Sequence, residues 1–308
     1  SVREHSHLDQ GSFIFESNGE RWAIDMGKEN YNLPGYWGTA GPRWQIFRMR
    51  AASHNTIVIN PDATGIDHNL DSFATVQKLE SKPRGAISTV DMSEVLKDNV
   101  KSAKRGFFLT DYRKSLVVRD EMDIPTSSEI YWFLYTRAEK AEIKGKNVVL
   151  ASGGKQLKVD FACNKDMQIV FEDAKALPNT PSLDGENPNA GIKRLMLKIN
   201  GSGKVNITAK LTPMGIPDSD VSEYDMDMEK WTIPDGEIPA VPRLDMIYMN
   251  GEPLEGFNQD TTSYAVKYVE GDTNVPQFTA SSDQYKLEIT QSGSFDQAAN
   301  IKVISTED

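Results

Sequence analysis

Three of the four histidines in the chain accompany acidic residues in a pattern that could bind a metal ion. His7 lies in the segment H-S-H-L-D-Q-G-S-F (residues 5–13), Asp25 in I-D-M-G (24–27) and His54 in H-N-T (54–56). Imidazole nitrogens and carboxylate oxygens are ligands that zinc accepts. These three residues are therefore a candidate metal site, and His5 beside them is a candidate catalytic group. Taken singly, each histidine is better explained as an ordinary polar residue on a sheet.

The elements that would position these ligands are short strands. Runs rich in β-branched and aromatic residues predict strands at residues 11–17, 20–25 and 55–60. Side chains alternate along a strand, so a chain already extended at residue 5 would place His5, His7 and Asp9 on one face. Ligands from three neighbouring strands can then converge on one ion.

The three motifs, in this order, resemble the β-sandwich domain of heparinase II/III-like polysaccharide lyases over about residues 1–215. The resemblance implies that His7, Asp25 and His54 hold a structural zinc ion and that His5 faces the substrate cleft. In such lyases a helical toroid precedes the sandwich and supplies the catalytic tyrosine. We therefore expect this chain to need that N-terminal helical domain as a partner and to be inactive alone. A periplasmic, cell-surface or secreted location follows from the resemblance only.

A stretch without acidic residues, from Asn30 to Asn60, interleaves aromatic residues with glycine and arginine. Aromatic rings can stack on sugar faces, and arginine pairs bidentately with carboxylate or sulfate groups. The stretch thus predicts a binding rim for an acidic, uronate-containing polysaccharide, unless its arginines are merely solvated in a surface loop. The predicted substrate-binding residues are Tyr31, Trp37, Arg43, Trp44, Arg48 and Arg50.

Composition indicates an all-β protein with little affinity for polyanions in general. A formal net charge of −11 over 308 residues argues against nucleic acid as a partner. No apolar run approaches the length of a membrane-spanning segment, and the single cysteine excludes an internal disulfide. Many short alternating runs separated by turn residues predict a large antiparallel β-sandwich.

Three segments divide the chain. Residues 1–215 are predicted to form the large sandwich, with a buried central strand at the aromatic run 130–135 and a turn at Gly201-Ser202-Gly203. Residues 216–242 are acidic and rich in proline, which is typical of a solvated linker. Residues 243–308 predict a small β-sandwich that resembles the cadherin-like modules of surface glycan proteins of Bacteroidetes. Its expected hairpin turn is Asn250-Gly251.

Three functions compete. The first is the sandwich domain of a lyase that cleaves acidic glycans by β-elimination, with His5 as base or as neutraliser of the uronate carboxylate. The second is a non-catalytic carbohydrate-binding or cell-surface scaffold module. The third is an iron oxygenase on a double-stranded β-helix, whose facial triad would be His7, Asp9 and His54. The metal hypotheses differ at one residue, because the lyase-type site uses Asp25 and the oxygenase uses Asp9.

Overall fold

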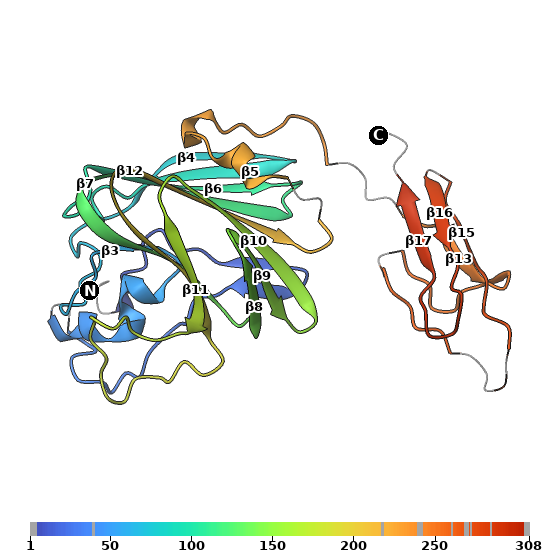
Figure 1. Ribbon diagram of the computed structural model, residues 1–308, viewed down its shortest axis with the longest axis horizontal. Coiled ribbons are helices and arrows are strands. Elements are labelled where there is room, and N and C mark those ends of the chain that lie inside the picture. Colours follow the sequence, from blue (N-terminus) through green and yellow to red (C-terminus); the bar gives the residue numbers. More distant parts are fainter. Residues whose placement is uncertain are drawn as a thin grey trace. The chain divides into compact units, whose positions relative to one another are not determined.

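The computed structural model describes residues 5–38, 41–216, 219–238, 243–259, 261–267, 271, 273–283 and 285–304. The chain divides into two compact units, Ser1–Ile238 and Pro239–Asp308 (Figure 1). Both units are built from antiparallel strands, which confirms the predicted all-β class. Within the described residues, no helix is long and apolar enough to cross a membrane.

The first unit is dominated by one large sheet. Its strand order is β4-β5-β6-β7-β12-β10-β9-β8, with β3 paired to β7 and β11 paired to β12, while β1 and β2 form a separate hairpin. The strands are β1 Phe15–Ser17, β2 Glu20–Ala23, β3 Ile57–Ile59, β4 Thr75–Lys82, β5 Gly85–Asp91, β6 Ser102–Thr110, β7 Ser115–Thr136, β8 Lys140–Lys144, β9 Asn147–Ser152, β10 Lys155–Cys163, β11 Met167–Asp173 and β12 Lys193–Pro213. The 3-10 helices are η2 Gly41–Gln45, η3 Phe47–Met49, η4 Ala51–Ser53, η5 Val221–Tyr224 and η6 Met228–Lys230.

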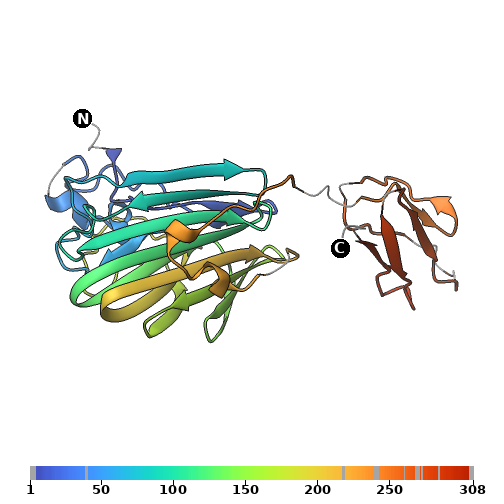
Figure 2. The same ribbon diagram turned by 90° about the horizontal axis from the view of Figure 1, so that it is seen from above.

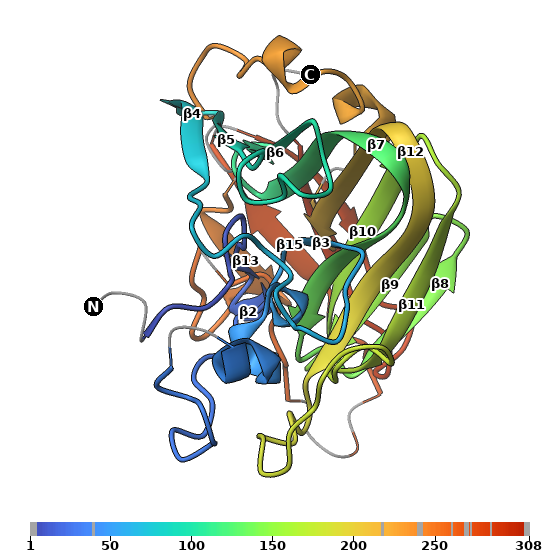
Figure 3. The same ribbon diagram turned by 90° about the vertical axis from the view of Figure 1, so that its left-hand side faces the viewer.

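Two long strands, β7 and β12, carry the sheet from one layer of the sandwich to the other. The first part of β7 pairs with β6 and its last part pairs with β3. Strand β12 pairs first with β11 and then with β10. Figure 3 shows the two strands curving together around the core.

The predicted turn at Gly201-Ser202-Gly203 is wrong. These residues lie inside β12, where the register with β7 shifts between Gly201 and Gly203. Such a bulge bends a strand without ending it. Gly203 has φ of 69°, a backbone conformation that glycine adopts without steric cost. The glycines therefore mark the bend between the layers rather than the end of a strand.

The aromatic run in β7 is a buried central strand, as predicted. Alternate side chains enter two different cores, because successive residues of a strand point to opposite faces. The first core lies between the layers and receives Ile130, Trp132 and Leu134; the second receives Tyr131, Phe133 and Tyr135. The second core is closed by the loops between β2 and β3, which carry the predicted site residues other than His5 and His7.

Residues 219–238 belong to the first unit, so the predicted linker from 216 to 242 is corrected for this part. Met228, Trp231 and Ile233 are buried against the sheet. Figure 2 shows this segment, in orange, crossing the outside of the sheet. Its acidic side chains meet basic partners there: Asp225 pairs with Arg119 and Glu229 with Lys104. Apolar anchors within an acidic run therefore make it a strap rather than a free connector.

Replacing Gly106 with alanine is expected to loosen this strap. A Cβ atom on Gly106 would lie 2.2 Å from Sδ of Met228 and 2.8 Å from Cζ3 of Trp231. Forcing an atom into such a contact costs about 1–3 kcal/mol. Urea denaturation followed by tryptophan fluorescence measures the loss. The matched control is Gly201→Ala, another strand glycine, where the nearest heavy atom is 3.5 Å from the added Cβ. Equal stability of the two variants would contradict the prediction.

The second unit contains two small sheets. Their strand orders are β14-β13-β15 and β16-β17, with bounds β13 Met246–Met249, β14 Glu252–Pro253, β15 Phe278–Ser281, β16 Lys286–Thr290 and β17 Asn300–Ile304. The predicted hairpin turn is confirmed, since Asn250 and Gly251 have φ of 51° and 90° between β13 and β14. The cadherin-like character of this unit stays a prediction.

Candidate functional site

The side chain of Asn55, in the H-N-T motif, ties together the strands around the predicted ligands. Its amide donates to the carbonyls of Phe13, at 2.7 Å, and Ile24, at 2.9 Å. Its Oδ1 accepts from the backbone N–H of Tyr135 at 2.6 Å. Asn55 is completely buried, and such a network satisfies backbone groups that burial would otherwise leave unpaired. The motif therefore fixes His54 relative to both neighbouring segments.

The three predicted metal ligands lie together. Oδ2 of Asp25 is 2.8 Å from Nδ1 of His54, and the rings of His7 and His54 have centroids 5.2 Å apart. The backbone N–H of Gly27 donates to Oδ1 of Asp25 at 2.7 Å. Gly27 has φ of 70°, so the turn after Asp25 needs a residue that tolerates a left-handed backbone. The I-D-M-G motif thus aims the carboxylate at His54.

Protonation states at this cluster suit metal binding. Burial, and after it the neighbouring His54, lower the pKa of His7 to about 4. Burial raises the pKa of Asp25, but the hydrogen bond and charge of His54, with the N–H of Gly27, outweigh it and lower the pKa to about 2. At neutral pH the cluster therefore presents a neutral imidazole and an ionised carboxylate, which are the forms that bind metal ions.

The donor set fits a zinc ion in chemistry. His54 is buried, and among the described residues its Nε2 has no hydrogen-bond partner. A buried imidazole nitrogen without a partner is costly, and a metal ligand bond is one way to satisfy it. In their present positions, however, no three His, Cys, Asp or Glu side chains of the described residues are arranged so that they could hold a metal ion.

The structure separates the two carboxylates that distinguish the metal hypotheses. Asp25 contacts His54, whereas Asp9 is exposed. The predicted strand at 11–17 begins only at Phe15, so His5, His7 and Asp9 precede it and do not share a strand face. A facial triad that includes Asp9 therefore has no support in this geometry.

An aromatic wall, with two of its three rings exposed, lies beside the cluster. We define it as Tyr31, Tyr36 and Trp37, whose ring centroids are 4.9–5.3 Å apart. Tyr31 and Trp37 are 42% and 48% exposed, so their rings are available to a ligand. The exposed ring of His5 meets Trp37 edge-on at 5.5 Å, and Nζ of Lys28 is 5.3 Å from the centre of the Tyr31 ring. Lys28 was not predicted, because nothing in the local sequence places its ammonium over an aromatic ring.

The prediction that three arginines and Trp44 form the rim is not what the structure shows. Arg43, Trp44 and Arg50 are buried. Arg43 donates to the carbonyl of Ser6 at 2.7 Å, and Arg50 pairs with Asp67 at 3.0 Å. Loops buried in this way carry carbonyls and carboxylates that need donors. The arginines supply them and hold the loops in place rather than facing a ligand.

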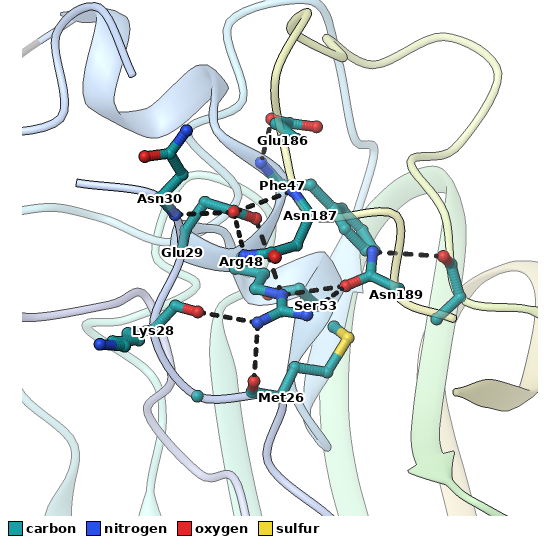
Figure 4. A network of polar contacts seen from close by, with 12 residues as sticks. Met26, Lys28, Glu29, Asn30, Phe47, Arg48, Ser53, Glu186, Asn187 and Asn189 are labelled. Carbon is teal, nitrogen blue, oxygen red and sulfur yellow. Dashed lines mark hydrogen bonds and ion pairs between the residues drawn. The ribbon is translucent and has the colours of Figure 1, made fainter. Parts of the chain in front are cut away.

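Arg48 is likewise engaged with the protein. Figure 4 shows its guanidinium between the backbone of Met26 and Lys28 and the side chain of Asn189. Nη1 donates to the carbonyls of Met26, at 3.0 Å, and Lys28, at 2.7 Å. Nε and Nη2 donate to Oδ1 of Asn189 at 2.9 and 2.8 Å. The arginine therefore joins the turn after Asp25 to the loop that precedes β12.

Comparison with known proteins identifies a family for most of the chain. Residues 1–209 match the family described as Heparinase II/III-like, C-terminal. Among solved structures, heparan sulfate lyase HepC from Pedobacter heparinus is similar, with 14% identity and a TM-score of 0.51 over 70% of this chain and 32% of that one. A structure described as heparinase III has 12% identity and a TM-score of 0.51 over 99% of this chain and 37% of that one.

At these identities the structural likeness shows a common fold. The chain spans about a third of the length of these two lyases, at 32% and 37%. No curated protein matches the sequence. The family match covers more than half of the chain and includes all three motifs around His7, Asp25 and His54, so this protein belongs to the heparinase II/III-like C-terminal family.

Proposed function

We propose that this chain is the β-sandwich part of a polysaccharide lyase that cleaves a uronate-containing acidic glycan by β-elimination. One observation carries the proposal: in a domain of this family, the Asp25–His54 pair and His7 adjoin His5 and a partly exposed wall of aromatic rings. A helical partner domain would supply the remaining catalytic groups. A secreted, periplasmic or cell-surface location is part of the same proposal.

The residues of the aromatic wall and those beside it suit the chemistry of such a reaction. In β-elimination a base removes the C5 proton of the uronate, and the electron pair forms the C4–C5 double bond. The C4–O bond then breaks, and the leaving oxygen takes up a proton. In this proposal His5 acts as the base or neutralises the uronate carboxylate. Tyr31 and Trp37 would stack on sugar faces, with Lys28 as a cation for the carboxylate or a sulfate.

His7, Asp25 and His54 are the residues that would hold a zinc ion in this proposal. Bound there, the ion would link three segments: the one before β1, the turn after β2 and the one before β3. This cross-brace would stabilise the aromatic wall. The support comes from the proximity of the three side chains, their protonation states and the buried Nε2 of His54.

Elemental analysis of the purified protein after a chelator rinse tests the metal part of the proposal. We expect about one zinc per chain in the wild type and little zinc in Asp25→Ala, because the variant loses one of the three proposed ligands. The control is Asp9→Ala, which removes an exposed carboxylate from the same region and should retain zinc. Zinc kept in Asp25→Ala but lost in Asp9→Ala would overturn the assignment.

Turnover tests the lyase part. We expect no unsaturated uronate from this chain alone on heparan-, chondroitin- or alginate-type glycans, and turnover when a helical toroid domain is joined to its N-terminus. In that joined protein, His5→Ala should abolish turnover while zinc content stays unchanged. Binding of the glycan without turnover in the joined protein would instead establish a carbohydrate-binding module.

A further inference from the structure

We infer that Arg48 is a positioning residue that sets the Asp25 carboxylate against His54, and that a distant loop, residues 183–189, holds Arg48 for this task. The inference rests on the proposed function of the His7/Asp25/His54 cluster and extends it to residues that touch neither metal nor substrate. We call Arg48, Asn189, Glu29 and Asn187 the clamp; most of its contacts are visible in Figure 4.

The inner half of the clamp acts on the turn that carries Asp25. Arg48 donates to the carbonyls of Met26 and Lys28, which flank Gly27 on both sides. Gly27 in turn donates its N–H to Oδ1 of Asp25 at 2.7 Å, which leaves Oδ2 for Nδ1 of His54 at 2.8 Å. A shift of the turn would therefore move the carboxylate directly. A carboxylate only accepts hydrogen bonds, so this contact also places the His54 proton on Nδ1.

The outer half of the clamp comes from the loop before β12. Asn189 accepts two hydrogen bonds from Arg48 through one oxygen and has φ of 53°, a left-handed conformation that asparagine tolerates. Oε1 of the buried Glu29 accepts from the backbone N–H of Asn187 at 2.9 Å and also from its side chain. Oε2 of Glu29 lies 3.6 Å from Nε of Arg48.

A third contact joins the same loop to the segment that carries Arg48. Oε1 of Glu186 accepts from the backbone N–H of Phe47, the residue before Arg48, at 2.8 Å. The side chains of Asn189 and Glu29, from two different loops, thus contact one arginine, whose side chain is only 12% exposed. A guanidinium has five donors in a rigid fork, so its separate nitrogens can hold two carbonyls and an amide oxygen in fixed directions, whereas a lysine carries its three donors on one nitrogen.

Substitution of Arg48 tests the inference with two readouts. Arg48→Gln removes the fork, and we expect its zinc affinity, measured by competition with a chelator, to fall about tenfold, as for other residues that orient metal ligands. Nitrogen-15 NMR of the histidine rings in zinc-free protein should show the Nδ1–H of His54 in the wild type and its loss in Arg48→Gln. Asn189→Ala keeps the cation and should shift both readouts in the same direction by less.

The matched control is Arg113→Gln. Arg113 also donates to backbone carbonyls, those of Lys82, Pro83 and Gly85, but it lies in the turn between β6 and β7. It should change neither zinc affinity nor the His54 signal, and a similar melting temperature in both variants separates positioning from a general loss of stability. Unchanged zinc affinity and an unchanged His54 signal in Arg48→Gln would overturn the clamp. If the wild type binds no zinc, the proposed metal site fails and the His54 signal alone decides the clamp.

Discussion

Replacing Arg105 with methionine is expected to lower the free energy of unfolding by about 3–5 kcal/mol. Arg105, in β6, is 1% exposed and donates to both carboxylate oxygens of Asp120 at 2.7 and 2.9 Å. Methionine keeps much of the apolar volume but has no donor. The Asp120 charge would then stay in the interior without its partner, and removing one partner of a buried pair costs far more than the pair itself contributes.

The guanidinium of Arg105 also connects two of the three motifs of the candidate site, those of His7 and His54. Its Nη1 donates to the carbonyl of Gly11 at 2.7 Å and to that of Asn55 at 2.8 Å. Gly11 lies in the same segment as His7, and Asn55 follows His54. Loss of Arg105 leaves both carbonyls without this donor inside the protein, so we expect its zinc content to fall together with its stability.

Urea denaturation of three variants separates these effects. The control is Arg21→Met, which breaks the exposed pair with Glu16, where the side chains are 57% and 55% exposed, and should cost less than about 1 kcal/mol. The double variant Arg105→Met/Asp120→Leu also removes the unpaired charge of Asp120 and should recover part of the lost free energy of unfolding. If Arg105→Met were no less stable than Arg21→Met, the buried pair between β6 and β7 would not contribute the predicted stability.

The sequence predicts the fold well wherever local pattern decides it. Alternation in the run 130–135 places one set of side chains in each core, and the turn at Asn250-Gly251 follows from its two residues. Prediction fails at Gly201 and Gly203, because a bulge and a turn have the same local composition. Only the continued pairing of β12 on both sides of the glycines shows that the strand does not end.

The site is predictable in part for the same reason. His7, Asp25 and His54 lie in compact motifs whose neighbours, such as Gly27 and Asn55, are local or adjacent in the sheet. The arginines between residues 43 and 50 were wrongly assigned to the rim. An acid-free stretch shows that their partners are not nearby in sequence, but it does not show whether those partners belong to a ligand or to the protein. One side-chain partner of Arg48, for example, is Asn189, which is 141 residues away in the sequence.

The strap at 219–238 illustrates a third limit. Its acidic and proline residues dominate the composition, and the apolar anchors Met228, Trp231 and Ile233 have no regular spacing. Met228 and Trp231 pack against position 106, on a strand far earlier in the chain, where a Cβ atom would lie within 3 Å of both side chains. The contact between the strap and position 106 cannot be predicted from the sequence of either segment alone.

Acidification is expected to destabilise the protein between about pH 6.5 and pH 4 through His68, the one histidine outside the candidate site. His68 is buried, and its Nε2–H donates to the carbonyl of Ile57 in β3 at 2.8 Å. Burial lowers the pKa of His68 to about 4 from its ordinary value of 6.5. Across that interval the unfolded chain binds a proton that the folded chain excludes, so stability is full above pH 6.5 and falls as the pH drops.

The size of the effect follows from the pKa difference. A shift from 6.5 to about 4 corresponds to a loss of roughly 3 kcal/mol by pH 4. His7 contributes in the same direction, since its pKa is also lowered to about 4, so the wild type alone cannot assign the loss. His68→Gln can: its amide retains a donor for Ile57 but does not titrate. Free energies of unfolding at pH 7.5, 5.5 and 4.5 should show a shallower loss in this variant, and equal losses in both proteins would rule His68 out as the source.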